Sequence, residues 1–165
     1  MKLSPLIKGI ITAVLMIATS LFTFYTLPPT SPLHYLVFAV YALGIIWTLV
    51  AFSKSPESTG KFGGFFNTGF RCFIVATLLM VVYTFTFNKL HPEFAEESAL
   101  VYKKELVAAQ LQASPGHKTP TEIEEAVARY KKGYTMALVY GSIFGYLIIG
   151  AVVTALASVI LTRRK

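Results

Sequence analysis

Four long apolar runs dominate the pattern of hydrophobic and polar positions along the chain. A hydrocarbon core about 30 Å thick needs about 20 apolar residues in a helix, and each run is close to that length or longer. Apart from His34 and Arg71, which stand at the starts of the second and third runs, the runs contain no ionisable cation and no acid. The pattern predicts an all-α, polytopic membrane protein with four transmembrane helices in a single membrane domain, 1–165. The predicted spans are 9–27, 34–52, 70–88 and 135–161.

Composition agrees with this interpretation. Hydrophobic residues make up 55% of the 165 residues, charged residues only 14%, and the mean hydropathy is +0.61. A soluble domain usually has about a quarter of its residues charged, so the composition excludes a domain that is wetted on all sides. The first run could also be a signal peptide with Lys2 and Lys8 as its basic front. Its apolar stretch is longer than the usual ~7–15 residues and no clear cleavage site follows, so we interpret it as a retained helix.

The charges predict the orientation of the helices. Four spans place both termini and the 53–69 loop on one side, where Glu57 is the only acid. The whole net charge of +7 then lies on that side, because cations and glutamates balance in the 89–134 segment. Lys and Arg near spans are retained in the cytoplasm, so we expect both termini to be cytoplasmic. The sequence pI of about 9.5 then reflects attraction to the lipid bilayer, and we expect no nucleic-acid partner.

The segment 60–71, before the third span, is rich in glycine and phenylalanine. At about 100° per residue, its phenylalanines and Phe73 share one helix face, and Gly63, Asn67 and Arg71 share the opposite face. The pattern predicts a cytoplasmic interfacial helix that continues into the third span. An unstructured loop is the alternative, whereas a phosphate loop is disfavoured because no strand precedes the segment and no nucleotide motif is present. The candidate interaction residues here are Phe62, Phe65, Phe66, Asn67, Phe70 and Arg71.

The polar insert 89–134 predicts an extracytoplasmic helical hairpin. A first helix is expected over 92–113, and Ser114-Pro115-Gly116 ends it. Thr119, Pro120 and Glu122 form a capping-box pattern that starts a second helix. This helix can continue from 120 to 161, with Gly133 as the expected bend. The two helices should pack together because neither buries its apolar stripe alone.

Reactive chemistry is scarce in the sequence. All eight acids are glutamates and none lies in a span, which argues against an ion-coupled transporter. The single Cys72 cannot form an intrachain disulfide, and His34, His91 and His117 give no ligand spacing typical of zinc. We therefore expect no catalytic residues, no metal and no cofactor. Span hydroxyls are expected to bond mostly to backbone carbonyls or to neighbouring helices.

Gly141 and Gly145 form a GxxxG motif in the fourth run. Such a smooth face lets helices approach closely. We expect it to pack inside the helical bundle, with homodimerisation as the alternative. Both glycines are candidate interaction residues.

The stretch FFNTGFR, the third span and the HPEF that follows it resemble a bacterial family, domain of unknown function 4199 (DUF4199). The similarity extends over nearly the whole chain. It implies a multi-pass protein of the bacterial cytoplasmic (inner) membrane and assigns no catalytic residues. It also suggests a polyprenyl-phosphate glycosyltransferase of the envelope as a partner.

Three functional hypotheses follow. The first is a non-enzymatic accessory or scaffold subunit that binds a membrane-protein partner or its own copies. The second is a small homo-oligomeric transporter or channel lined by hydroxyls such as Thr77 and Thr84. The third, an enzyme of lipid metabolism, would need acids near the membrane. The sequence offers only Glu57, Glu93, Glu96 and Glu97 for that role.

Overall fold

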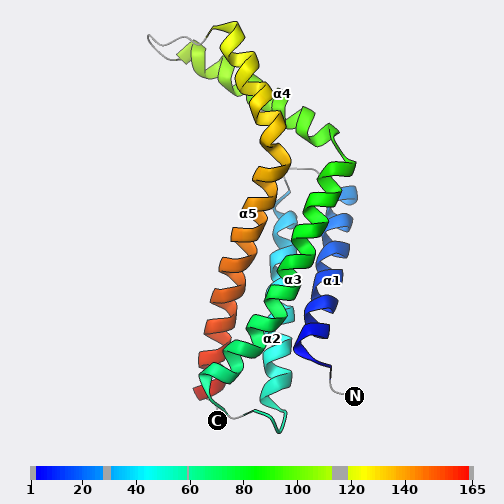
Figure 1. Ribbon diagram of the computed structural model, residues 1–165, viewed down its shortest axis with the longest axis vertical. Helices are drawn as coiled ribbons and strands as arrows, with labels where there is room; N and C mark the ends of the chain where they lie inside the picture. The colour runs from blue at the N-terminus through cyan, green and yellow to red at the C-terminus, as the bar shows by residue number, and fades with distance from the viewer. Residues whose placement is uncertain (1–2, 28–30, 59, 113–118, 164–165) are drawn as a thin grey trace. The chain divides into compact units, whose positions relative to one another are not determined.

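The computed structural model describes residues 3–27, 31–58, 60–112 and 119–163, and every regular element in these ranges is a helix. The helices follow one another along the chain as drawn in Figure 1. Their bounds are α1 Pro5–Thr26, the 3-10 helix η1 Pro32–Tyr35, α2 Leu36–Ser53, α3 Phe62–Leu90, α4 Glu93–Gln112 and α5 Pro120–Arg163.

Four segments are long and apolar enough to cross a membrane: α1, η1 with α2, α3 and α5. They coincide with the four runs found in the sequence, so the prediction of an all-α protein with four candidate spans is confirmed. Helix α4 is not among them, because charged and polar residues interrupt its apolar positions.

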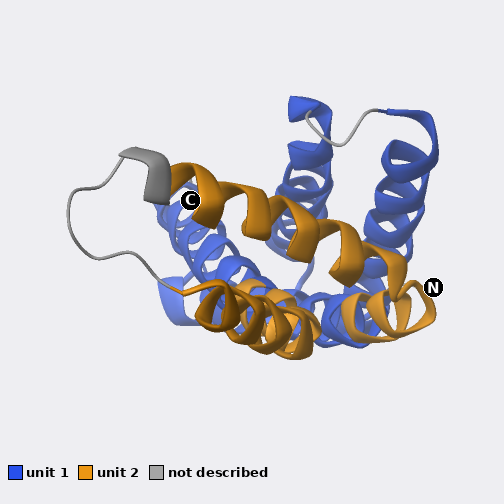
Figure 2. Ribbon diagram, turned by 90° about the horizontal axis from the view of Figure 1, so that it is seen from above, with its two compact units in different colours: residues 1–83, 142–165 blue, residues 84–141 orange. Residues whose placement is uncertain are grey.

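The chain forms two compact units, coloured separately in Figure 2. The four-helix unit comprises residues 1–83 and 142–165, and the α4 unit comprises residues 84–141. Helices α3 and α5 each have residues in both units.

The core of the four-helix unit combines apolar side chains with close contacts at small residues. A methyl group placed on Gly9 of α1 would lie 2.6 Å from the carbonyl oxygen of Cys72 in α3. One placed on Gly69 of α3 would lie 2.5 Å from the Thr154 side chain of α5. These glycines let the helix backbones approach each other. The buried apolar cluster around them is Ala13, Met16, Val37, Tyr41, Ile45, Leu49, Phe65, Phe73, Ala76, Met80 and Tyr146.

Several helix ends differ from the predicted spans. Helix α1 begins at Pro5, where the Ser4 side chain accepts a hydrogen bond from the Ile7 amide (3.3 Å). Lys8 therefore lies inside the helix and is 9% exposed, whereas the sequence placed it on the flank. The criterion of apolar run length misses this start because Ser and Pro are helix-start residues without being apolar. Residues 62–71, for which an unstructured loop was the alternative, are helical and continue into the third predicted span within α3.

In the α4 unit, α4 packs against the first part of α5. The rings of Tyr102 and Tyr130 stack with centroids 4.5 Å apart. The Lys131 Nζ lies 2.7 Å from the Glu96 Oε1. Ala99 and Ile123, one from each helix, are buried. The two helices thus bury part of their apolar stripes, as amphipathic helices do when they pair.

The predicted capping box at the start of α5 is confirmed. The Thr119 amide donates to Glu122 Oε2 (2.6 Å), and the Glu122 amide donates to Thr119 Oγ1 (3.3 Å). Each side chain therefore satisfies a backbone donor that the first turn leaves free.

The Lys131–Glu96 ion pair gives a testable charge exchange. Replacing Glu96 with Lys should loosen the α4–α5 packing by less than about 1 kcal/mol, since both side chains are about half exposed. The double variant Glu96→Lys/Lys131→Glu should recover most of that loss at low salt. Hydrogen exchange of the amides in 93–112 measures the effect. A double variant that exchanges as fast as the single variant would contradict it.

Candidate functional site

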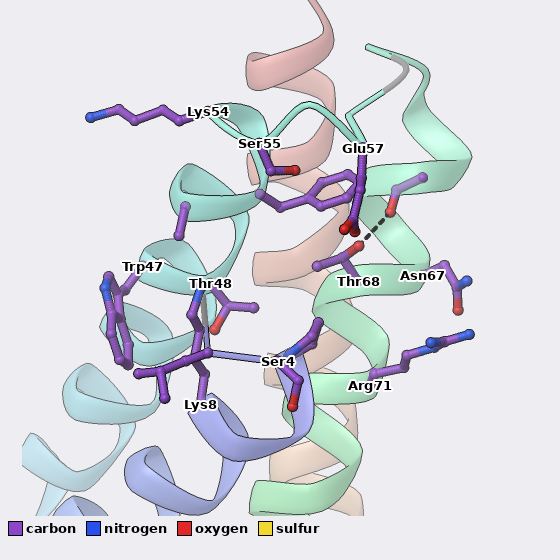
Figure 3. Close-up of a pocket in the computed structure, with 15 residues that line it drawn as sticks. Ser4, Lys8, Trp47, Thr48, Lys54, Ser55, Glu57, Asn67, Thr68 and Arg71 are labelled. Carbon is purple, nitrogen blue, oxygen red and sulfur yellow. Dashed lines mark hydrogen bonds between the residues drawn. The ribbon is translucent and has the colours of Figure 1, made fainter. Parts of the chain in front are cut away.

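A pocket of about 800 Å³ lies at the end of the four-helix unit where α1 and α3 begin and α2 ends (Figure 3). Its apolar lining includes Trp47 and Phe52 of α2. Its polar lining is Ser4, Lys8, Thr48, Lys54, Ser55, Glu57, Asn67, Thr68 and Arg71. Three cations and one acid therefore border a cavity large enough for a small ligand.

Lys8 is the most deeply buried of these charges. Its Nζ lies 5.4 Å from the centroid of the Trp47 ring. Among the described residues, no carboxylate lies within ion-pair distance of it. A buried ammonium without a counter-ion is costly, and a ring face compensates only part of that cost.

The other side chains of the pocket lie at different distances from Lys8. Figure 3 shows Trp47 and Thr48 near Lys8 and the Glu57 carboxylate across the pocket, while Lys54 extends away. The Ser55 Oγ is buried and has no hydrogen-bond partner among the described residues. The pocket thus holds a positive group, with a carboxylate on its opposite side.

The phenylalanines at the start of α3 divide between core and surface. Phe65 is fully buried and meets the Phe52 ring edge-on, with centroids 5.4 Å apart. Phe62, Phe66 and Phe70 form a stacked row, with centroids 5.7 and 6.5 Å apart. Phe62 and Phe70 are each 43% exposed. The predicted single apolar face therefore includes two residues of the protein core, Phe65 and Phe73.

Asn67 and Arg71, predicted on the polar face of this helix, are exposed and line the pocket. The sequence placed them opposite the phenylalanines but did not connect them with Lys8 or Trp47. That connection requires α1 and the end of α2 to pack beside α3.

The prediction that the GxxxG face packs inside the bundle is wrong at both Gly141 and Gly145. A methyl group on Gly141 or on Gly145 would meet no atom of the described residues within 4 Å. Helix α5 instead packs through a line of residues spaced by four, which begins at Tyr146. One residue turns a helix by about 100°, so this line faces a different direction. Its members after Tyr146 are Gly150, Thr154 and Ser158, all buried.

A hydrogen-bonded group centred on Tyr41 links three helices of the four-helix unit. The Tyr41 hydroxyl donates to the Tyr146 carbonyl of α5 (3.1 Å) and lies 3.0 Å from the Thr77 Oγ1 of α3. The Thr48 hydroxyl of α2 lies 2.9 Å from the Gly44 carbonyl of its own helix and 3.3 Å from the Cys72 Sγ of α3. These bonds join helices through side chains, which fixes their register.

Most span hydroxyls with a resolved bond act locally, as expected. Thr12 donates to the Lys8 carbonyl (2.8 Å) and Thr19 to the Leu15 carbonyl (2.8 Å), each one turn back in the same helix. The hydroxyls of Thr154 and Ser158 are buried without a partner in the described part of the chain.

The start of α4 carries a contact between His91 and Glu93. The His91 Nδ1 lies 2.7 Å from the Glu93 Oε1. Hydrogen bonding from the backbone at the helix start, and then from His91, lowers the pKa of the Glu93 carboxyl. The contact therefore stabilises this end of α4 at neutral pH and is lost as the pH falls through that lowered pKa. His117 lies outside the described residues, and within those residues no three His, Cys or acidic side chains form a metal-binding group.

The fold and these features define an all-helical protein with four helices able to cross a membrane. The family comparison agrees with the resemblance seen in the sequence. The chain belongs to the family described as protein of unknown function (DUF4199), whose profile matches residues 6–163. The chain matches no curated protein and no solved structure.

Proposed function

We propose that the protein is a non-enzymatic accessory or scaffold subunit of the bacterial cytoplasmic membrane. In this proposal both termini are cytoplasmic, and α4 with the start of α5 forms an extracytoplasmic hairpin. The charge distribution supports the orientation, because the net positive charge falls on the side of the termini.

An uncovered apolar stripe on α4 carries the proposal. Leu100 is 60% exposed and Val107 is 42% exposed, although α4 is not a candidate span. Together with Lys103, Lys104 and Ala108 they line a shallow, open pocket of about 390 Å³. Apolar side chains grouped in one shallow pocket on a charged helix favour a docking role, whereas apolar residues scattered singly would not.

The beginning of α3 supplies a second contact surface in this proposal. The stacked row Phe62, Phe66 and Phe70 is partly exposed at the cytoplasmic end of its span. Aromatic rings at that depth suit an interfacial helix that touches lipid headgroups or a neighbouring subunit.

The partner we propose is another membrane protein, and the family resemblance favours an envelope glycosyltransferase that acts on polyprenyl phosphate. Self-association through the open Gly141–Gly145 face is the alternative arrangement. A transporter lined by hydroxyls has less support, because hydroxyls such as Thr12 and Thr19 already bond to their own helix.

Purification in mild detergent, with identification of co-eluting proteins, tests the scaffold proposal. A stoichiometric membrane protein should co-elute with the wild type and with Leu100→Met, which keeps the apolar surface. Leu100→Glu should lose it, because a carboxylate would have to be desolvated in the contact. A stable assembly of this chain alone, unchanged by Leu100→Glu, would refute the proposal.

A further inference from the structure

The pocket between the starts of α1 and α3 and the end of α2 contains groups that the scaffold proposal does not use. Lys8 is only 9% exposed, lines the pocket and has the Trp47 ring as its neighbour. A largely buried cation that has a ring face and no carboxylate beside it is a group that an anionic oxygen ligand would satisfy.

The position of the pocket limits the kind of ligand. Its lining comes from the ends of three candidate spans, near Pro5, Ser53 and Phe62. Span ends lie at the depth of lipid headgroups, where tryptophan is also enriched. The apolar walls at Trp47 and Phe52 suit the glycerol and upper acyl region of a lipid.

The charges in the pocket point to phosphate. Even without Lys54, which extends away, Lys8 and Arg71 outnumber Glu57, so the lining is net positive. Glu57 lies across the pocket from Lys8 and would repel a second negative group, but it can accept a hydrogen bond from a hydroxyl. A phosphodiester with a hydroxyl-bearing headgroup satisfies both sides.

We propose that this pocket binds the phosphate of an anionic, hydroxyl-bearing phospholipid headgroup. Lys8 contacts the phosphate, and Glu57 accepts a hydrogen bond from the headgroup hydroxyl. A soluble phosphate ester would present the same chemistry, and the experiment below separates the two sources.

Trp47 makes the test direct, because it is the only tryptophan in the chain and it lines the pocket. The full chain is placed in nanodiscs of phosphatidylcholine that contain brominated phosphatidylglycerol, or brominated phosphatidylcholine as the neutral quencher. Quenching of Trp47 should show a preference for the anionic lipid of about fivefold, which corresponds to one basic contact near a membrane surface.

Matched variants separate the pocket from general surface charge. Lys8→Gln should abolish the preference, whereas Lys8→Arg should keep it. Lys61→Gln removes the same charge from an exposed residue that does not line the pocket, and should change the preference by less than about twofold because exposed charges are screened.

Added glycerol 3-phosphate or inorganic phosphate identifies the source in discs without anionic lipid. A saturable change in Trp47 fluorescence that disappears in Lys8→Gln would support binding of soluble phosphate at the same site. A wild type with no lipid preference and no response to free phosphate would overturn the proposal, and this comparison requires no variant to fold. An equal loss in Lys8→Gln and Lys61→Gln would also overturn it, since only general surface charge would then be at work.

Discussion

Replacing Gly9 with alanine is expected to destabilise the four-helix unit by about 1–3 kcal/mol, the usual cost of an overpacked contact. The added methyl group would lie 2.6 Å from the backbone oxygen of Cys72 and 3.1 Å from the Val75 Cβ. A backbone oxygen cannot rotate away, so α1 and α3 must move apart. Their separation would loosen every contact along the shared face of the two helices.

The same substitution at Gly133 is the matched control. This glycine is also helical, but a methyl group there would meet nothing within 4 Å in the described part of the chain. Gly133→Ala should be neutral or stabilising by up to about 1 kcal/mol, because alanine is the better helix former. Midpoints of unfolding in mixed detergent micelles give both values. Equal shifts in the same direction would mean that the α1–α3 contact is not tight.

The four candidate spans were predictable because their signal is local. A run of about 20 apolar residues is recognised without knowing its neighbours, and each of the four runs became a helix. The caps at Ser4 and Thr119 also depend on nearby residues, but only the second was used in the prediction. Helix α1 therefore starts earlier than expected, and Lys8 moves from the flank into the helix.

Positions facing the core were harder to predict, because four apolar helices can pack in many registers. The GxxxG motif at Gly141 suggested one face of α5, whereas the buried line passes through Gly150, Thr154 and Ser158. Small residues four apart were present in both lines. In a membrane, where lipid is as apolar as leucine, hydrophobicity does not choose between such faces.

The pocket could not be predicted for a related reason. Lys8, Trp47 and Arg71 lie on three helices, and their meeting depends on the order in which those helices pack. Tyr41 is similar, since it is one of nine tyrosines and no feature of the sequence marks it as buried. The available signal for the pocket was Lys8, a lysine close to the start of an otherwise apolar helix. The charge pattern placed Lys8 on the flank of the first span instead.

Truncating Tyr41 to alanine is expected to be the most damaging single change in the four-helix unit. The side chain is fully buried, and its ring packs edge-on against Tyr146 with centroids 5.5 Å apart. Emptying an aromatic site in a core costs about 3–5 kcal/mol, and we expect about 3 because lipid rather than water surrounds the helices. Tyr140→Ala is the control, because Tyr140 is 60% exposed on α5.

The Tyr41 hydroxyl can be separated from the ring by a double-mutant cycle. Tyr41→Phe removes the donor to the Tyr146 carbonyl and the partner of Thr77, and should cost about 1 kcal/mol, as polar contacts between membrane helices do. Thr77→Val should cost a similar amount. The double variant should lose less stability than the sum of the two single losses, because both changes break the same contact. Strict additivity would show that the two hydroxyls, 3.0 Å apart, do not depend on each other. The association of α2 with α3 would then depend on the packing of the Tyr41 ring. In that case Tyr41→Ala would still destabilise the unit strongly, whereas the loss of the hydroxyl would not act through Thr77.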